Sequence, residues 1–176
     1  MERLGLEFIV ESPDIDEHVI PEESAEKHVL RLAREKSEAI GKKYPDALII
    51  GSDQIALLNS HIITKPLDYD TAVKQLKEMS GHTITFLTAL SVINTKKSTR
   101  YLECVPYYVT FRNLNDIEIE RYLKKEKPYD CAGGFKSEVS GISLVEKMEG
   151  TDPTSLIGLP LIRLSHILRK EGIELP

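Results

Sequence analysis

The 176-residue sequence has no tryptophan, only two cysteines and no excess of basic residues. Cys104 and Cys131 form no metal-spaced motif, so they are expected to be small buried side chains in a reducing compartment, the cytoplasm. The chain carries 28 acidic and 23 basic residues, a net charge of −5. This balance gives no electrostatic case for binding a nucleic-acid polymer.

Long apolar runs are also missing, and no basic segment followed by an apolar one opens the chain. The sequence therefore predicts neither a membrane span nor a secretory signal. Five histidines are present without close ligand spacing, which argues against a zinc site built from histidine. Because no repeat or linker divides the chain, residues 1–176 are expected to form a single domain with a sizeable core.

Apolar periodicity predicts an α/β fold in which a mixed central β-sheet carries helices on both sides. Residues 83–94 and 99–111 are expected to form a long β-hairpin, with Pro106 at a bulge or an edge. Arg3-Leu4-Gly5 is typical of a helix end. Strands are expected at 6–10, 46–58, 61–64, 83–94, 99–111 and 142–145, and helices at 21–43, 68–79, 115–125 and 159–170.

The stretch 46–58 is an apolar strand interrupted by Ser52-Asp53-Gln54. A carboxylate within an apolar strand needs a partner, because an unpaired buried charge is costly. Two readings of Asp53 follow. It is either a structural residue bonded to the backbone amides of a turn, or a carboxylate at the floor of a cleft that binds a metal or takes a proton from water.

Further charged residues combine with Asp53 into a chemical pattern. Glu17 lies in an acidic loop, Lys36 on the first long helix, and Lys65 in Thr64-Lys65-Pro66 after a short strand. Mg²⁺ prefers a few carboxylates with phosphate oxygens and water, and lysine is a compact charge suited to phosphate. The set is compatible with phosphoryl chemistry on a nucleotide.

Five motifs that carry these residues occur in an order that resembles the Maf family of nucleotide pyrophosphatases, through nearly all of the chain. The motifs are Arg31-Leu32-Ala33 followed by Lys36, Gly51-Ser52-Asp53-Gln54, Thr64-Lys65-Pro66, Ala132-Gly133-Gly134-Phe135 and Ile157-Gly158-Leu159-Pro160. The resemblance implies two lobes around a cleft and the hydrolysis of a nucleoside triphosphate to its monophosphate and pyrophosphate.

By that likeness, Asp53 would accept a proton or position the attacking water. Glu17 and Asp53 would hold a divalent cation, Mg²⁺ or alternatively Mn²⁺. Lys36 and Lys65 would neutralise the triphosphate, whose leaving group gains charge.

The Ser-Asp-Gln form of the motif, together with Phe135-Lys136-Ser137-Glu138, resembles the branch that hydrolyses 7-methyl-GTP. Gln54 and Glu138 would then read the base. Methylation at guanine N7 leaves a positive charge on the ring, which a carboxylate attracts while it accepts the N1–H and N2–H donors. The alternatives are that Glu138 is a solvated loop residue and that Phe135 belongs to the core rather than stacking on the base.

The family begins with a strand and a Ser-x-Ser-x-x-Arg phosphate loop, and this sequence starts just after them. If the chain is truncated, weak or absent activity is expected. Two alternatives therefore stay open: a broader pyrophosphatase for dTTP, UTP or non-standard nucleotides, and a nucleotide-binding or division-regulatory protein with little activity. The long hairpin could also support a homodimer.

Overall fold

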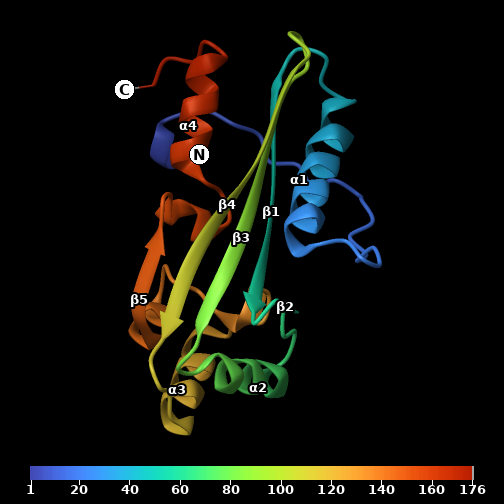
Figure 1. Cartoon of the computed structure of the whole chain (residues 1–176). Helices are drawn as coiled ribbons and strands as arrows, with labels where there is room; N and C mark the ends of the chain where they lie inside the picture. Colours follow the sequence, from blue (N-terminus) through green and yellow to red (C-terminus); the bar gives the residue numbers. More distant parts are fainter. Residues whose placement is uncertain (176) are drawn as a thin grey trace.

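The computed structural model describes residues 1–175 and is built on one five-stranded sheet, in the order β2-β1-β3-β4-β5 (Figure 1). All four neighbouring pairs are antiparallel. The predicted α/β architecture, with a central sheet, flanking helices and a long β-hairpin, is confirmed, but the sheet is antiparallel rather than mixed. The strands are β1 (Leu48–Leu58), β2 (His61–Ile63), β3 (Thr83–Asn94), β4 (Thr99–Phe111) and β5 (Val145–Gly150).

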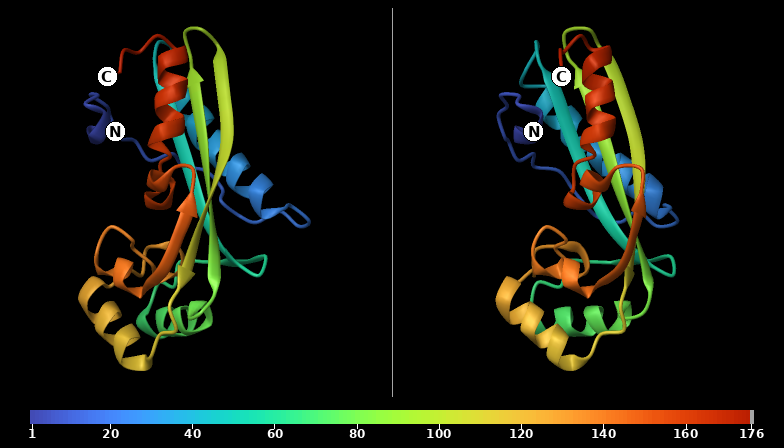
Figure 2. Two further views of the ribbon diagram at one scale, coloured as in Figure 1. Left: turned by 60° about the vertical axis from the view of Figure 1, so that its left-hand side comes forward. Right: turned by 90° about the vertical axis from the view of Figure 1, so that its left-hand side faces the viewer.

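Helices cover the long strands in two groups (Figure 2). Toward one end, α1 and α4 lie on opposite faces of β1, β3 and β4, while α2 and α3 gather at the other end near β5. Both described ends of the chain lie on the α4 side. The α-helices are α1 (Ala25–Gly41), α2 (Tyr69–Met79), α3 (Asp116–Glu126) and α4 (Leu161–Lys170); short 3-10 turns are η1 (Glu2–Leu4), η2 (Ala132–Gly134), η3 (Ser140–Leu144) and η4 (Pro153–Ile157).

The beginnings of the helices follow from capping side chains. A capping box opens α3, where Asn115 and Glu118 each bond the other's backbone N–H. Helix α1 begins later than predicted, after Ser24, whose hydroxyl accepts from the Lys27 amide. Glu22 has φ 65°, a left-handed conformation that does not fit in a right-handed helix, so the turn at 21–22 stays outside it.

Two predicted strands are wrong. Residues 6–10 form no strand, and Ile9 and Val10 are exposed, because this apolar segment pairs with no neighbouring strand. Residues 142–145 belong mostly to η3, and the strand follows as β5, which pairs with β4 from Tyr107 onward. Charged residues dominate β5, so its sequence carries little strand signal. Pro106 pairs with β3 on one side, but β5 does not reach it on the other. It therefore lies at an open edge of β4, which confirms the edge expectation rather than the bulge.

Buried apolar residues form three clusters around the sheet. One lies between the sheet and α1, one beneath α4, and the largest between the sheet, α2 and α3. Phe135 packs against Phe86 and Phe111 in the largest cluster, which confirms its core reading. Cys104 and Cys131 are free thiols and only partly buried, contrary to expectation; Cys104 lies at the margin of the α1 cluster. Within residues 1–175, no helix is both long and apolar enough to cross a membrane.

Glu171 ties the end of α4 to the β3–β4 hairpin. Its carboxylate accepts hydrogen bonds from Thr99 Oγ1 at 2.6 Å, Asn94 Nδ2 at 2.6 Å and the Tyr101 hydroxyl at 3.0 Å. Lys97 Nζ lies 3.4 Å from it. These bonds, led by that of Thr99, lower the pKa of Glu171 from 4.5 to about 2.

We expect Glu171→Gln to lower the melting temperature by several degrees at pH 7. Because the folded protein lowers the pKa of Glu171, the carboxylate stabilises the fold above its ordinary pKa. That contribution is lost as the pH falls toward about 2. Thermal unfolding followed by circular dichroism should therefore show the deficit shrinking between about pH 5 and pH 2. Glu174→Gln, at an exposed position nearby, is the control, and a deficit independent of pH would contradict this account.

Candidate active site

Asp53 projects from the middle of β1 toward α1, and Gly51 makes the close approach of this helix possible. A Cβ atom at Gly51 would lie 2.4 Å from the Ala33 carbonyl oxygen and 2.9 Å from the Ser37 amide nitrogen. Both are backbone atoms of α1 and cannot turn aside. The absence of a side chain at Gly51 therefore sets how near α1 lies to β1, and with it the position of Lys36.

Lys36 lies between two carboxylates. Its Nζ atom is 2.6 Å from Asp53 Oδ1 and 2.7 Å from Glu17 Oε1. The side chain of Asp53 is 12% exposed and that of Glu17 is 54% exposed, so the ammonium joins a buried carboxylate to one at the surface. In residues 1–175, Asp53 accepts its hydrogen bond from Lys36 and from no backbone amide. The reading of Asp53 as a turn-capping residue is therefore wrong.

The electrostatics of the three groups differ with their burial. Burial raises the pKa of the Asp53 carboxyl above its ordinary value, and the bond from Lys36 offsets this only in part. Burial alone would lower the pKa of Lys36, but its bonds with Asp53 and Glu17 raise it. The bond with Lys36 lowers the pKa of Glu17. Lys36 thus keeps its proton, and Asp53 is a better proton acceptor than an exposed aspartate.

Lys65 lies on the surface side of this group, in the exposed segment after β2. Its charge adds to that of Lys36 in lowering the pKa of Glu17, so it lies within electrostatic reach of that carboxylate. Among the described residues, no hydrogen bond or ion pair joins Lys65 to Asp53. The structure thus brings Glu17, Lys36 and Asp53 into direct contact and places Lys65 near them.

Gln54 faces away from Asp53, because successive side chains of a strand point to opposite faces. Its Nε2 atom lies 2.7 Å from the Ser155 carbonyl oxygen, 3.2 Å from that of Leu156 and 2.9 Å from Thr88 Oγ1. Ser52 Oγ lies on the same face, 2.7 Å from the Gly158 carbonyl oxygen. The amide nitrogen of Gln54 thus bonds the η4 segment, on the face of β1 opposite the ion pairs of Lys36.

Asp152 holds that segment in place and is not among the residues predicted from the sequence. Its side chain is fully buried. Oδ1 accepts from the amide and hydroxyl of Thr154, and Oδ2 accepts from the amides of Ile162 and Arg163 at the start of α4. The signal that could have revealed it is the Asp-Pro-Thr sequence, since aspartate is a preferred N-cap and proline suits the first helical position.

Glu138 is exposed in the segment that follows η2, and its carboxylate lies 3.5 Å from Ser137 Oγ. The Tyr122 hydroxyl fixes the backbone before it, donating to the Gly134 carbonyl oxygen at 3.1 Å and accepting from the Lys136 amide at 2.9 Å. No described contact connects Glu138 with the Lys36 ion pairs. Its role in reading a base stays a prediction from the resemblance.

A divalent cation fits this site only together with a substrate. Within residues 1–175, no group of three or more His, Cys, Asp or Glu side chains could hold a metal ion. Glu17 and Asp53 each bond the Lys36 ammonium through one oxygen, Oε1 and Oδ1, so the second oxygen of each carboxylate is the one that could ligate a cation. Mg²⁺ commonly takes one or two carboxylates and completes its shell with phosphate oxygens and water. The two carboxylates therefore suit an ion that arrives with a polyphosphate.

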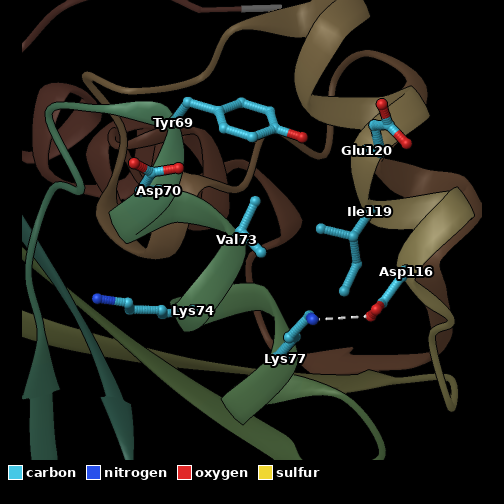
Figure 3. Close-up of a pocket in the computed structure, with 8 residues that line it drawn as sticks. All are labelled: Tyr69, Asp70, Val73, Lys74, Lys77, Asp116, Ile119 and Glu120. Atoms are coloured by element: carbon cyan, nitrogen blue, oxygen red, sulfur yellow. Dashed lines mark ion pairs between the residues drawn. The ribbon is translucent and has the colours of Figure 1, made fainter.

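Two cavities lie outside the ion-paired group. One of about 440 Å³ lies between α2 and α3, where Lys77 and Asp116 form an ion pair at 2.9 Å (Figure 3). The other, of about 710 Å³, follows the edge of β1 that β2 leaves unpaired and is lined mainly by apolar side chains, with Ser52 among them. Neither is lined by any of the six predicted site residues, all of which the structure describes.

Comparison with known proteins identifies the family to which the motifs around Lys36, Asp53 and Lys65 belong. A family model described as "Maf-like protein" matches residues 1–171. The chain belongs to the Maf family. The match spans every motif on which the resemblance to Maf rests, including those that hold Lys36, Asp53 and Lys65.

Relatives of this Maf chain are similar along nearly their whole length. A 7-methyl-GTP pyrophosphatase of Pseudomonas savastanoi pv. phaseolicola is 51% identical over 174 residues, covering 99% of this chain and 91% of the relative. A protein of the same name from Pseudomonas aeruginosa is 48% identical over 174 residues, with the same coverage. Another from Aromatoleum aromaticum is 48% identical over 176 residues, covering 100% of this chain and 91% of the relative.

Gly51→Ala is expected to destabilise this Maf chain by about 1–3 kcal/mol, because the added methyl group must push α1 away from β1. Urea denaturation measures the change in the free energy of unfolding. Gly41→Ala is the matched control, since its Cβ would lie 3.5 Å from Thr95 Cγ2, an ordinary contact. Equal stability of the two variants would show that the close approach at Gly51 is not a packing constraint.

Proposed function

We propose that this chain is a nucleoside triphosphate pyrophosphatase that hydrolyses 7-methyl-GTP to 7-methyl-GMP and pyrophosphate in the cytoplasm. The observation that carries the proposal is the contact of Lys36 with Asp53 and Glu17 within a Maf-family chain. The names of relatives about half identical to this chain support the choice of substrate.

The reaction is a displacement at the α-phosphorus. A water oxygen forms the new bond to phosphorus, and the bond to the oxygen that bridges the α- and β-phosphates breaks. The water proton passes to Asp53, at Oδ2, because Oδ1 already accepts from Lys36. Pyrophosphate leaves with the electron pair of the broken bond, so its negative charge grows during the step.

The two lysines stabilise the negative charge that grows on the leaving pyrophosphate. Lys36 keeps its proton because its bonds to Asp53 and Glu17 raise its pKa, and Lys65 adds a second positive charge near Glu17. Glu17 and Asp53 would hold a divalent ion, Mg²⁺ or Mn²⁺, together with the phosphate oxygens. When bound, that ion supplies further positive charge to the leaving group.

Base recognition is assigned to Glu138. Gln54 was expected to share this role, but its side chain lies on the face of β1 opposite Asp53, where its amide nitrogen bonds the η4 segment. The 7-methylguanine ring is a cation with N–H donors on one edge, and an exposed carboxylate matches both properties. A neutral base lacks the charge, so the attraction favours 7-methyl-GTP over GTP.

Asp53→Asn should lower pyrophosphate release by about a hundred-fold or more, since an amide does not accept the water proton. Release is measured with magnesium on a panel of 7-methyl-GTP, GTP, UTP and dTTP. Asp46→Asn, at an exposed residue paired with Lys96, is the control and should keep the unmutated rate. An unmutated rate for Asp53→Asn with an intact circular dichroism spectrum would refute the assigned role. Preference for UTP or dTTP would favour the broader pyrophosphatase, and binding without release the regulatory alternative.

Glu138→Gln tests the choice of base separately. The variant keeps one acceptor and loses the charge, so kcat/KM for 7-methyl-GTP should fall more than kcat/KM for GTP. Steady-state kinetics on both nucleotides measures the ratio. Glu146→Gln, an exposed glutamate on β5, is the matched control. Equal losses on the two substrates would count against base reading by Glu138.

A further inference from the structure

Glu17 lies in a segment that regular structure does not hold. Residues 6–24 contain no helix or strand, and Glu17 itself is exposed. A long exposed side chain in such a segment would ordinarily sample many positions. Yet Glu17 Oε1 lies 2.7 Å from Lys36 Nζ. The contacts that hold the neighbouring backbone therefore bear on where the Glu17 carboxylate lies.

Arg31 on α1 supplies such contacts through its planar guanidinium. Nε donates to Glu23 Oε1 and Nη2 to Glu23 Oε2, both at 2.9 Å, and Nη2 also donates to the His18 carbonyl oxygen at 2.9 Å. His28 Nδ1 lies 3.1 Å from the same Glu23 carboxylate. The anchored carbonyl belongs to the residue next to Glu17.

Burial distinguishes this cluster from an ordinary surface ion pair. The side chains of Arg31, Glu23 and His28 are 12%, 11% and 7% exposed. A shielded charge pair of this kind is strongly destabilised when one partner is removed. The bonds of Arg31 lower the pKa of Glu23 to about 2, so the carboxylate stays ionised at neutral pH.

Helix α1 therefore bears both the anchor and the target. Arg31 and Lys36 lie five residues apart on this helix. Arg31 bonds the backbone of the segment at His18, and Lys36 forms the ion pair with Glu17. We propose that Arg31 is a positioning residue, which acts through Glu23 and the His18 carbonyl to hold Glu17 against Lys36. The inference rests on the proposed function only in that Glu17 takes part in the reaction.

A double-mutant cycle separates positioning from general stability. Arg31→Lys keeps the charge but loses the fork, and should lower kcat/KM by about ten- to a hundred-fold. In a Glu17→Gln background, where there is no longer a carboxylate to position, the same change should cost less than about two-fold. Thermal unfolding should show the same loss of stability from Arg31→Lys in both backgrounds. Losses of kcat/KM that multiply would overturn the inference.

Hydrogen exchange gives a readout that does not depend on catalysis. Amides of residues 14–20 should exchange faster in Arg31→Lys than in the unmutated chain, measured by mass spectrometry without nucleotide. Arg34→Lys, the same change at an exposed position of α1, is the control and should leave exchange and kcat/KM unchanged. Should Arg31→Lys fail to fold, Glu23→Gln weakens the same fork from the other side and should give the same pattern.

The outcomes are distinguishable. If Glu17→Gln keeps the unmutated rate, the proposed role of Glu17 fails, whereas faster exchange of residues 14–20 in Arg31→Lys would still support the anchoring. If Glu17→Gln loses activity but Arg31→Lys changes neither exchange nor kcat/KM, the role of Glu17 stands and the positioning inference is refuted.

Discussion

A lysine ammonium held between two carboxylates is the interaction on which the candidate site depends. Lys36 pairs with Asp53 on β1 and with Glu17 in the segment before α1, and the contact with Asp53 requires α1 to lie very close to β1. Gly51 permits that closeness, and the apolar cluster of Val29, Ala33, Ile55 and Ala89 maintains it. Packing and charge thus act at the same place.

Side chains on both faces of strand β1 make contacts that matter for the site. Gly51 and Asp53 point to α1, while Ser52 and Gln54 hold the η4 segment on the opposite side. Its register with β3, in which Asp53 lies opposite Ala89, fixes this division. A shift by one residue would exchange the two sets of side chains, so that the carboxylate would face η4 and the amide would face α1.

Features that depend on local sequence could be predicted. The apolar run of β1, the long hairpin and the Asn115–Glu118 capping box are each written in a few neighbouring residues. The strand expected at 6–10 was wrong because a strand exists only with a partner to pair with. The start of β5 was misplaced because its charged residues hide an edge strand.

The site divides in the same way. The motifs assigned Lys36 and Asp53 to one site, and in the structure the two side chains are in contact. The use of Gln54 by carbonyl oxygens about a hundred residues further along could not be predicted, because no local pattern reports such a contact. Two further contacts could not be predicted for the same reason. One is the pair of hydrogen bonds that Asp152 accepts from amides at the start of α4, and the other is the close approach of the α1 backbone to Gly51.

These distances along the chain also set an order of assembly. Lys36 and Asp53 are 17 positions apart, whereas Ser52 and the Gly158 carbonyl are 106 apart. Contacts between near neighbours in sequence close small loops and form early, while those between remote segments wait for much of the chain. A polypeptide still emerging from the ribosome can therefore join α1 to β1 while the other face of that strand remains bare. The η4 segment covers that face only when synthesis is almost complete.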